Sequence, residues 1–369
     1  FIAGSQPWPF SPLHAVGGWH PLPASQIYLS DNALDETKGP INLFFLNAGD
    51  TDVRVGSSPR ARAGMTILSA AERRYCEPLL RGFAERRPAI EIDFVFGIST
   101  DLQQRFLADA ASGGATADLF WSSAMDQQLG LVMNGHAQPH GLKRNLPSGT
   151  SFGDLAVATT REPLFTLTRN GSMPAGTPGE IASLIASDTE RFRQRIAVPD
   201  IEANGLGFLA MFWWSLMDPA FDDLMEALAS CSPHAVGSAP ALIAAMSEGA
   251  ELALHLLGGY ATRAVAANPD LKIAPSSSPP MAVARVAFIP RRAANPEVAS
   301  AFLDFMLSPE GQAAIGEAGL YPLDASAANS VTPIPLDERL VDQALRATLL
   351  KRWRTALGRN NDYSRRKHA

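Results

Sequence analysis

NPEVASAFLDFMLSPEGQAAIGEAGLY, residues 295–321, predicts two short helices that meet at a corner. Asn295 can cap the first helix, and Pro296 fits the first helical position because that position needs no N–H donor. Apolar side chains then recur at helical spacing and give this helix one face to bury: Val298, Phe302, Phe305 and Met306. A second cap-and-proline start follows at Ser308, and Gly319 suits the left-handed residue that ends a helix. By its pattern alone, this corner fits any α/β protein.

The composition is that of an ordinary globular protein, and 369 residues are enough for two domains. The net charge of -6 argues against a nucleic-acid binder, which normally presents a concentrated basic face. No run of residues approaches the ~20 apolar residues that a membrane span needs. Cys76 and Cys231 are the only cysteines, and they form no Cys-x-x-Cys pair. They therefore give no metal or redox motif and do not locate the protein.

Residues 1–64 differ from the rest, because they are rich in proline and glycine and show no sustained periodicity. We expect an irregular N-terminal extension that is poorly ordered. Residues 41–46 could form a strand, but no partner is evident nearby. The triplet at residues 61–63, Ala-Arg-Ala, has the form of a signal-peptidase site, although the apolar stretch expected before it is missing. The domain proper is expected to begin near Gly64.

From Met65 onward, strands alternate with helices, which predicts parallel pairing with helices on both faces of a sheet. Residues 152–168 hold two extended segments around a proline, typical of a crossover between lobes. A second α/β set follows, and residues 275–284 lead the chain back. The predicted fold is α/β, with two lobes whose mixed, mainly parallel sheets are joined by crossover strands. Lobe 1 is expected to hold residues 64–160 and 276–369, and lobe 2 residues 161–275.

Small polar residues follow successive strands of the first lobe. The candidates are Ser69 with Ala70, Ser99 with Thr100, and Ser122 with Ser123. Loops at the carboxyl ends of parallel strands meet in one crevice, where hydroxyls and helix N–H groups suit an anion or a polar oxygen. Each serine could instead simply cap its helix, and Ser69 with Glu72 has the form of a capping box. As a set, they predict a ligand site.

Several segments, taken in order, resemble bacterial periplasmic substrate-binding proteins of ABC importers, in the two-lobed type II class. The matching parts are residues 66–69, 97–99, 117–121, the crossover at 162–165, and the corner at 295–312. The nearest subgroup is the ferric-iron-binding-like one, and the resemblance covers roughly residues 64–321. Residues 334–353 resemble, less closely, the terminal helix of members linked to phosphoglycerate-transport regulation. The resemblance implies a periplasmic location and a binder, not an enzyme. It also implies hinge closure over a small solute, and an ABC permease or a sensor kinase at the inner membrane as partner. We expect a monomer.

The resemblance also implies where the ligand lies. Iron-binding members hold the metal largely with two adjacent tyrosines; here Tyr260 matches one of them, and Ala261 replaces the other. Because phenolate oxygens supply much of the hard donor set that ferric ion needs, a small anionic ligand ranks first. A phosphonate, a phosphorylated acid or a carboxylate would fit, and ferric ion ranks second. No metal site and no cofactor is predicted.

Further predicted site residues lie in the second lobe and at the crossovers. Asn204 and Gly205 open an apolar helix, and Gly259 precedes the tyrosine, so their N–H groups can approach a ligand oxygen. Of the arginines near the crossings (Arg161, Arg169 and Arg285), any one could pair bidentately with a carboxylate or phosphate, and Arg161 is the predicted site residue.

Two other patterns give weaker predictions. Residues 205–210 fit Gly-x-Gly-x-x-Ala, so a nicotinamide-dependent oxidoreductase is the enzyme alternative. Residues 199–204, however, form a loop where that fingerprint needs a tight turn. His136 and His140 are spaced like a helical metal pair, but Pro139 excludes a regular helix, and both are expected on a surface loop. His255 lies in an apolar strand and is expected in the core.

Overall fold

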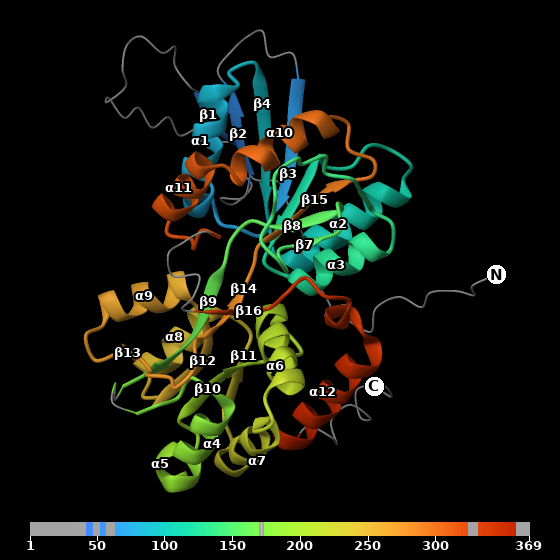
Figure 1. Ribbon diagram of the computed structural model, residues 1–369. Helices are drawn as coiled ribbons and strands as arrows, with labels where there is room; N and C mark the ends of the chain where they lie inside the picture. The colour runs from blue at the N-terminus through green and yellow to red at the C-terminus, as the bar shows by residue number, and fades with distance from the viewer. Residues whose placement is uncertain are drawn as a thin grey trace, which may run out of the picture.

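The computed structural model describes residues 42–46, 52–56, 63–169, 171, 173–323 and 331–358. These residues form two lobes, one above the other in Figure 1, each built on its own sheet. The strands of both sheets are covered by helices, and two segments cross between the lobes. The predicted two-lobed α/β fold is confirmed. Within the described residues, antiparallel strand pairs outnumber parallel ones, so the sheets are mixed but less parallel than expected.

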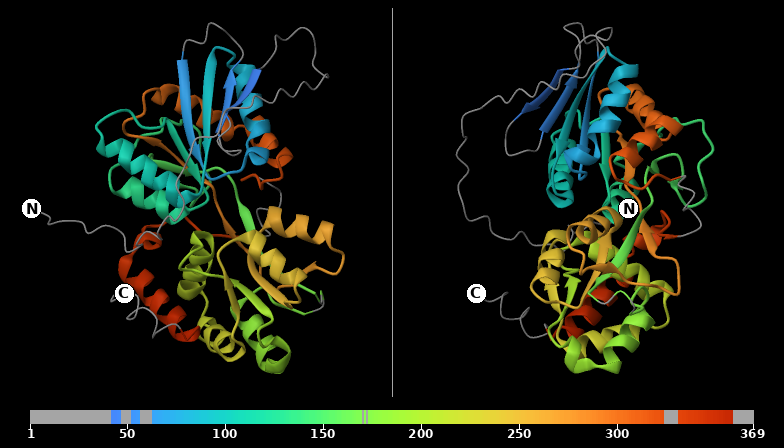
Figure 2. Two further views of the ribbon diagram at one scale, coloured as in Figure 1. Left: turned by 180° about the vertical axis from the view of Figure 1, so that it is seen from behind. Right: turned by 90° about the vertical axis from the view of Figure 1, so that its left-hand side faces the viewer.

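The first sheet has the order β1-β2-β4-β3-β5-β15-β8-β7, with β6 also paired to β15. Its strands are β1 (Asn42–Leu46), β2 (Asp52–Gly56), β3 (Ala63–Ser69), β4 (Ile90–Phe96), β5 (Leu119–Ser122), β6 (Ala137–Gln138), β7 (Ser151–Phe152), β8 (Ala156–Ala158) and β15 (Val286–Pro290). Strand β3 is parallel to both neighbours, as helical connections require. Helices α1 (Glu77–Arg86), α10 (Pro296–Met306) and α11 (Pro309–Glu317) pack together against one face. Helices α2 (Ser99–Ala111) and α3 (Met125–Met133) cover the other (Figure 2).

Strands β1 and β2 were not foreseen as a pair. Residues 42–46 form the expected strand, but its partner is residues 52–56, and β2 in turn pairs with β4. The prediction that this strand has no nearby partner is therefore wrong. Ala63, the last residue of the predicted cleavage triplet, opens β3, whereas Ala61 and Arg62 lie outside the described residues.

The second sheet has the order β11-β10-β12-β9-β14-β16, with β13 also paired to β9. Its strands are β9 (Glu162–Thr168), β10 (Ile196–Pro199), β11 (His234–Val236), β12 (Leu252–Leu257), β13 (Lys272–Ile273), β14 (Met281–Val283) and β16 (Thr332–Pro333). Helices α8 (Ala239–Ser247) and α9 (Gly258–Ala267) lie on one side of it, and α6 (Gly205–Met217) on the other. Helices α4 (Pro178–Ser187), α5 (Thr189–Phe192) and α7 (Phe221–Cys231) pack together beside α6.

Two short crossings join the lobes. The chain passes from β8 to β9 through residues 159–161, and returns from β14 to β15 through Ala284 and Arg285. The two crossings run side by side, because the Thr159 N–H donates to the Arg285 carbonyl at 2.8 Å. The crossover predicted within residues 152–168 contains the first crossing, and the return predicted at residues 275–284 ends where the second crossing begins. That these crossings act as a hinge stays a prediction.

The C-terminal residues make a third link. Strand β16 pairs with β14, the short helix η3 (Glu338–Val341) packs on α3, and α12 (Gln343–Ala356) packs on α6 and α7. These residues were expected in lobe 1. Helix α12 packs on helices of the second lobe, while its Arg346 pairs with Asp126 of α3 in the first lobe. The lobe boundaries stay a prediction.

The corner forms as predicted, with one exception. Helices α10 and α11 begin at Pro296 and Pro309, and Gly319 has a positive φ of 81°. Ser308 caps α11, since its Oγ accepts from the Gly311 N–H at 3.1 Å. Asn295 makes no side-chain cap; its own N–H donates to an Asp118 carboxylate oxygen at 2.6 Å.

Three smaller predictions concern the cysteines, His140 and the absence of a membrane-spanning helix. Cys76 and Cys231 are free and buried, and burial raises the pKa of both thiols. His140 is buried, so the prediction that it lies on the surface is wrong. Its Nδ1 accepts from the Leu142 N–H, and its backbone N–H donates to the Asp154 carbonyl. No described helix is long and apolar enough to cross a bilayer.

Candidate functional site: the cleft between the lobes

The strand ends of the first sheet bring two serines and an arginine together. Ser69 ends β3 opposite Trp121, and Ser122 ends β5 opposite Val286. Arg285 directly precedes Val286, so it stands at the same end of the sheet. Ser69 and Ser122 are fully buried, and Arg285 is 4% exposed.

None of the predicted serines caps a helix in the structure. Ser69 Oγ accepts from the Ala71 N–H at 3.0 Å within the loop. The Ser69–Glu72 capping box is absent, because a 3-10 turn (η1, Arg73–Tyr75) intervenes and α1 begins only at Glu77. Ser99 is the first residue of α2 and has no capping bond.

Ser99 and Ser122 contact each other instead. Their Oγ atoms lie 3.1 Å apart, and Ser122 Oγ also accepts from the Ala124 N–H at 3.2 Å. The capping role that could have explained each serine separately is therefore wrong for Ser69, Ser99 and Ser122, and two of the three loops meet directly. Of their neighbours, Ala70 and Ser123 are half-buried and Thr100 is exposed.

On the second lobe, α6 starts against the first lobe. Asn204 Oδ1 caps α6 by accepting from the Gly207 N–H at 2.8 Å. A Cβ on Gly205 would lie 3.9 Å from Gln127 Nε2 of α3, which places this helix start at the boundary between the lobes. A Cβ on Gly207 would lie 2.3 Å from Pro199, so packing against the preceding strand explains the second glycine of the Gly-x-Gly-x-x-Ala pattern.

The start of α9 makes the closest contact with the first lobe. A Cβ on Gly258 would lie 2.6 Å from the Tyr321 ring, and one on Gly259 would lie 3.3 Å from the Gly319 carbonyl. Tyr260 Oη donates to Glu72 Oε1 at 2.5 Å. The lobes therefore touch here.

Tyr321 ends the corner and was not among the predicted site residues. It is half-buried at the lobe boundary beside Gly258. Burial raises the pKa of its phenol, and the nearby negative charge of Glu162 adds to the effect.

Two more side chains of the cleft were missed by sequence reasoning. Glu72 accepts the Tyr260 bond, and the rings of Tyr75 and Tyr260 lie 6.5 Å apart. With Tyr321, three of the five tyrosines gather around the start of α9. Glu72 and Tyr75 follow Ser69 closely in the sequence, and this was the one signal that could have indicated them.

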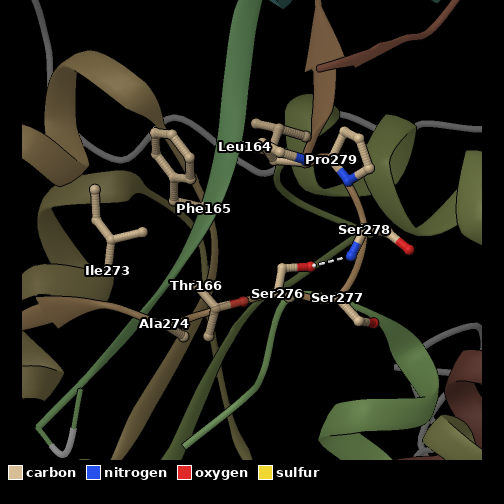
Figure 3. A pocket seen from close by; sticks show the side chains of 11 residues that line it. Leu164, Phe165, Thr166, Ile273, Ala274, Ser276, Ser277, Ser278 and Pro279 are labelled. Atoms are coloured by element: carbon tan, nitrogen blue, oxygen red, sulfur yellow. Dashed lines mark hydrogen bonds between the residues drawn. The ribbon is translucent and has the colours of Figure 1, made fainter. Parts of the chain in front are cut away.

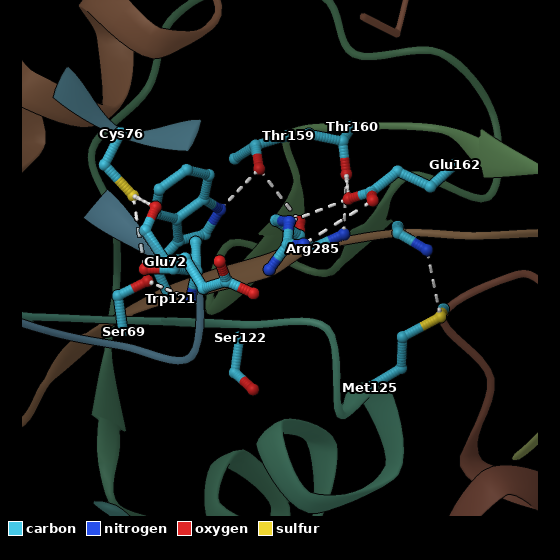
Figure 4. Close-up of polar contacts among 12 residues, drawn as sticks. Ser69, Glu72, Cys76, Trp121, Ser122, Met125, Thr159, Thr160, Glu162 and Arg285 are labelled. Carbon is cyan, nitrogen blue, oxygen red and sulfur yellow. Dashed lines mark hydrogen bonds and ion pairs between the residues drawn. The ribbon is translucent and has the colours of Figure 1, made fainter. Parts of the chain in front are cut away.

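The three arginines near the crossings differ in their surroundings. Arg285 forms a buried ion pair with Glu162 (Nε to Oε1, 2.7 Å), and its guanidinium centre lies 6.0 Å from the Trp121 ring (Figure 4). Arg161, the predicted site residue, is half-buried, and its backbone N–H donates to the Tyr321 carbonyl at 2.8 Å. Arg169 binds backbone carbonyls of Met246 and Ala250 within the second lobe. The position of Arg161 fits the cleft edge, and its contact with a ligand stays a prediction.

A separate cavity of about 390 Å³ lies in the second lobe beside β9, between the segments of β9 that pair with β13 and with β14 (Figure 3). It is lined by Leu164, Phe165, Thr166, Gly176, Ile273, Ala274 and residues 276–280. No charged side chain is among these residues, so the cavity does not suit an anionic ligand. Metal binding by carboxylate, histidine or cysteine clusters has no candidate either, since the described residues hold no group of three such side chains.

Comparison with known proteins agrees with this geometry. A family profile described as bacterial extracellular solute-binding protein matches residues 66–321. The substrate-binding protein of an ABC transporter from Agrobacterium tumefaciens is 25% identical, with a TM-score of 0.73 over 86% of this chain and 100% of that one. No curated protein sequence matches significantly.

More distant structures share the fold. Trichodesmium IdiA (FutA), solved with iron and citrate, is 14% identical, with a TM-score of 0.62 over 79% of this chain and 99% of that one. AfuA from Actinobacillus pleuropneumoniae, solved with fructose-6-phosphate, is 16% identical, with a TM-score of 0.62 over 80% and 99%.

The two lobes and the paired crossings, together with these matches, define a type II substrate-binding protein of the ABC-importer class. The chain belongs to the bacterial extracellular solute-binding protein family.

Proposed function

We propose that this protein captures a small anionic solute in the cleft and delivers it to an ABC permease. The observation that carries the proposal is the set of non-capping serines, Ser69, Ser99 and Ser122, at the strand ends of the first lobe. Hydroxyls that are not needed as helix caps are available as donors to a ligand oxygen. The starts of α6 and α9 contact the first lobe from the second, and in this proposal they add backbone N–H groups to the site.

Binding would work by hinge closure. The crossings at residues 159–161 and 284–285 bend, and the second lobe swings away to admit the solute. Closure then buries the solute between the serine loops and α9, where the Tyr260–Glu72 bond links the lobes. The permease recognises the closed form. Such a role needs no chemical step, so we propose a binder and not a catalyst, located in the periplasm as is usual for the family.

A thermal-shift screen tests the proposal. Phosphonates, phosphorylated three-carbon acids, carboxylates, sugar phosphates and oligopeptides would each be added to the purified protein, because a ligand that binds the native state raises its apparent stability. We expect an anionic compound to raise Tm, and Ser122→Ala to reduce the shift. Ser230→Ala is the matched control, because Ser230 is exposed and bonds only within α7. A shift produced only by neutral solutes would contradict the proposal.

Ferric ion is the second candidate, favoured by the gathering of Tyr75, Tyr260 and Tyr321 beside Glu72. Phenolate and carboxylate oxygens are the hard donors that ferric ion prefers. Addition of ferric citrate would then produce a visible tyrosinate-to-iron absorption band that Tyr260→Phe removes. A colourless protein after ferric addition excludes this candidate.

A third candidate is a sensory role, in which the closed form binds a sensor kinase domain. The two partner types separate in a reconstituted assay. Delivery predicts that the loaded protein stimulates ATP hydrolysis by its permease, whereas sensing predicts kinase autophosphorylation without transport.

A further inference from the structure

Arg285 is buried in the hinge with part of its hydrogen-bonding capacity unused. Its side chain is 5% exposed, and neither Nε nor Nη1 has a hydrogen-bond partner in the described part of the chain. Nε is ion-paired with Glu162, whereas Nη1 has no observed ion pair among those residues. A guanidinium carries five N–H donors, and leaving a buried donor unsatisfied costs free energy. This cost falls away if a ligand atom occupies the position beside Nη1.

The surroundings hold the guanidinium by one edge only. Glu162 pairs with Nε at 2.7 Å and lies 3.5 Å from Nη2, and Glu162 Oε1 also accepts from Thr160 Oγ1 at 3.1 Å. Thr160 Oγ1 in turn accepts from the Arg285 backbone N–H at 2.8 Å. The backbone of Arg285 and the Nε–Nη2 edge of its guanidinium are thus both held by residues at the crossings.

The other edge of the guanidinium belongs to the cleft. Arg285 stands at the end of the sheet where Ser69 and Ser122 lie, since Val286 pairs with Ser122. Figure 4 shows Glu162 on one side of Arg285 and Ser69, Glu72 and Ser122 on the other. An oxygen that reached Nη1 would therefore come from the cleft side.

We propose that Arg285 is the anion-binding residue of the cleft, and that its Nη1 donates to an anionic oxygen of the solute beside the hydroxyls of Ser69 and Ser122. The proposal rests on solute capture in the cleft. It assigns the charge-assisted contact to Arg285 in place of Arg161, and a hydrogen bond from a guanidinium to an anion is roughly twice as strong as a neutral one. Glu162 and Thr160 act as positioning residues.

The placement also couples binding to the hinge. The Arg285 carbonyl accepts from the Thr159 N–H and from Thr159 Oγ1 at 2.9 Å, so the residue that binds the anion is bonded to both crossings. A solute bound at Nη1 would fix Arg285 and hence the crossing strands in the closed geometry. Solutes that lack an anionic oxygen would not do so.

Two probes that carry only the anionic group test the proposal: methylphosphonate and acetate. We expect at least one of them to raise the Tm of the wild type when added at roughly 50 mM, and Arg285→Gln to weaken its binding more than tenfold. Arg193→Gln is the matched control, because Arg193 is an exposed arginine of the second lobe that pairs with Glu190 beside α5, and it should leave binding unchanged. The comparison between the probes distinguishes a phosphonate or phosphate group from a carboxylate.

A second measurement covers the case in which Arg285→Gln does not fold. Crystals of the wild type soaked in the better probe should show it within hydrogen-bond distance of Arg285 Nη1. Thr160→Val should reduce binding severalfold by loosening the guanidinium without removing it. The proposal is overturned if neither probe stabilises or occupies the wild-type site. It is also overturned if Arg285→Gln binds as well as the wild type. If Arg285→Gln binds as well as the wild type, a solute still binds and the proposed function stands. The proposed function is contradicted only if no solute in the wider screen binds the wild type.

Discussion

The hinge and the C-terminal residues both connect the lobes, and each contains a buried arginine–carboxylate pair. In the hinge, Arg285 pairs with Glu162 at 2.7 Å. In the C-terminal segment, residues 331–358, Arg346 of α12 pairs with Asp126 of α3 at 2.8 Å. The side chains of all four residues are at most 8% exposed. The two pairs are chemically alike but join different parts of the molecule.

The difference lies in what moves when the cleft opens. Arg285 sits on one crossing and Glu162 directly follows the other, and the two crossings run side by side, so we expect bending to carry both together. Arg346 belongs to a helix packed on α6 and α7, whereas Asp126 belongs to the first lobe. The guanidinium centre of Arg346 also lies 4.0 Å from the centroid of the Phe208 ring in α6. Elsewhere in the C-terminal segment, the Leu336 N–H donates to the Gly149 carbonyl of the first lobe. We therefore expect the C-terminal segment to limit how far the lobes separate, a role that the hinge pair cannot have.

Asp126→Ala should have the largest effect. It leaves the Arg346 charge buried without its carboxylate, which typically costs 3–5 kcal/mol, so we expect about 4 kcal/mol less stability in urea unfolding. It should also widen the range of opening, measured by small-angle scattering or by distances between labels on the two lobes.

The double variant Asp126→Leu with Arg346→Met is the control, since replacing both partners with apolar groups is often neutral. It should regain most of the lost stability while keeping the wider opening. Equal opening in the wild type and in both variants would show that the segment does not restrain the lobes.

The second-largest expected effect is a loss of stability at acid pH. It also tests whether the C-terminal segment transmits unfolding between the lobes. His255 is buried in β12 at a register shift, with φ of 59° and its ring 4.2 Å from that of Trp214, and burial lowers its pKa to about 3. Because the folded pKa lies below the ordinary value of about 6.5, its stabilising effect is complete above pH 6.5 and is lost as pH falls towards 3. At pH 4 the loss is roughly 3 kcal/mol, at about 1.4 kcal/mol for each pH unit.

His255→Asn removes the titration, and asparagine tolerates the left-handed backbone. Its stability should therefore fall less between pH 7 and pH 4 than that of the wild type. If the C-terminal segment couples the lobes, acid unfolds the wild type in one transition, and Asp126→Ala separates it into two. A parallel decline of the wild type and His255→Asn would refute the role of His255.

Glu162→Gln tests the hinge pair and should have a smaller effect. Glutamine keeps an acceptor for Arg285 and Thr160, so we expect a loss of about 2 kcal/mol, within the range for a weakened buried hydrogen bond. Opening should stay at its wild-type range, in contrast to Asp126→Ala. A similar widening in both variants would mean that the two connections are mechanically equivalent.

The sequence predicted the fold well because local signals and the chain's order agree. Proline at the first position of α10, the positive φ at Gly319 and the buried face with Phe302 all follow from short-range rules. Strand β2 was missed because residues 52–56 are short and polar in part, so their pairing with β4 depends on contacts distant in sequence. The contacts of α12 with the second lobe were missed for the same reason.

That the serines bind a ligand stays a prediction. They lie at or just after the strand ends as expected, but none of their hydroxyls caps a helix, and after β3 the turn η1 separates Ser69 from α1. Glu72, Tyr75 and Tyr321 meet at α9 only through the folding of three distant segments. No spacing along the chain encodes such a meeting. The choice among three arginines likewise depended on burial, which distinguishes Arg285.

The smallest expected effect compares two helix starts in the corner, next to the hinge. Ser308 caps α11 through the Gly311 N–H, so Ser308→Ala should cost about 1 kcal/mol. Asn295 occupies the same position before α10 but makes no side-chain cap, so Asn295→Ala should cost only a few tenths of a kcal/mol. Asp118 explains the difference, because its carboxylate accepts from the Asn295 N–H and takes over the role of fixing the start of α10. Urea unfolding of both variants and of Asp118→Asn measures this, and a larger loss at Asn295 than at Ser308 would contradict it. Both helix starts lie within the first lobe, so neither cap variant should change the opening range, which separates this local stability from the motion of the lobes.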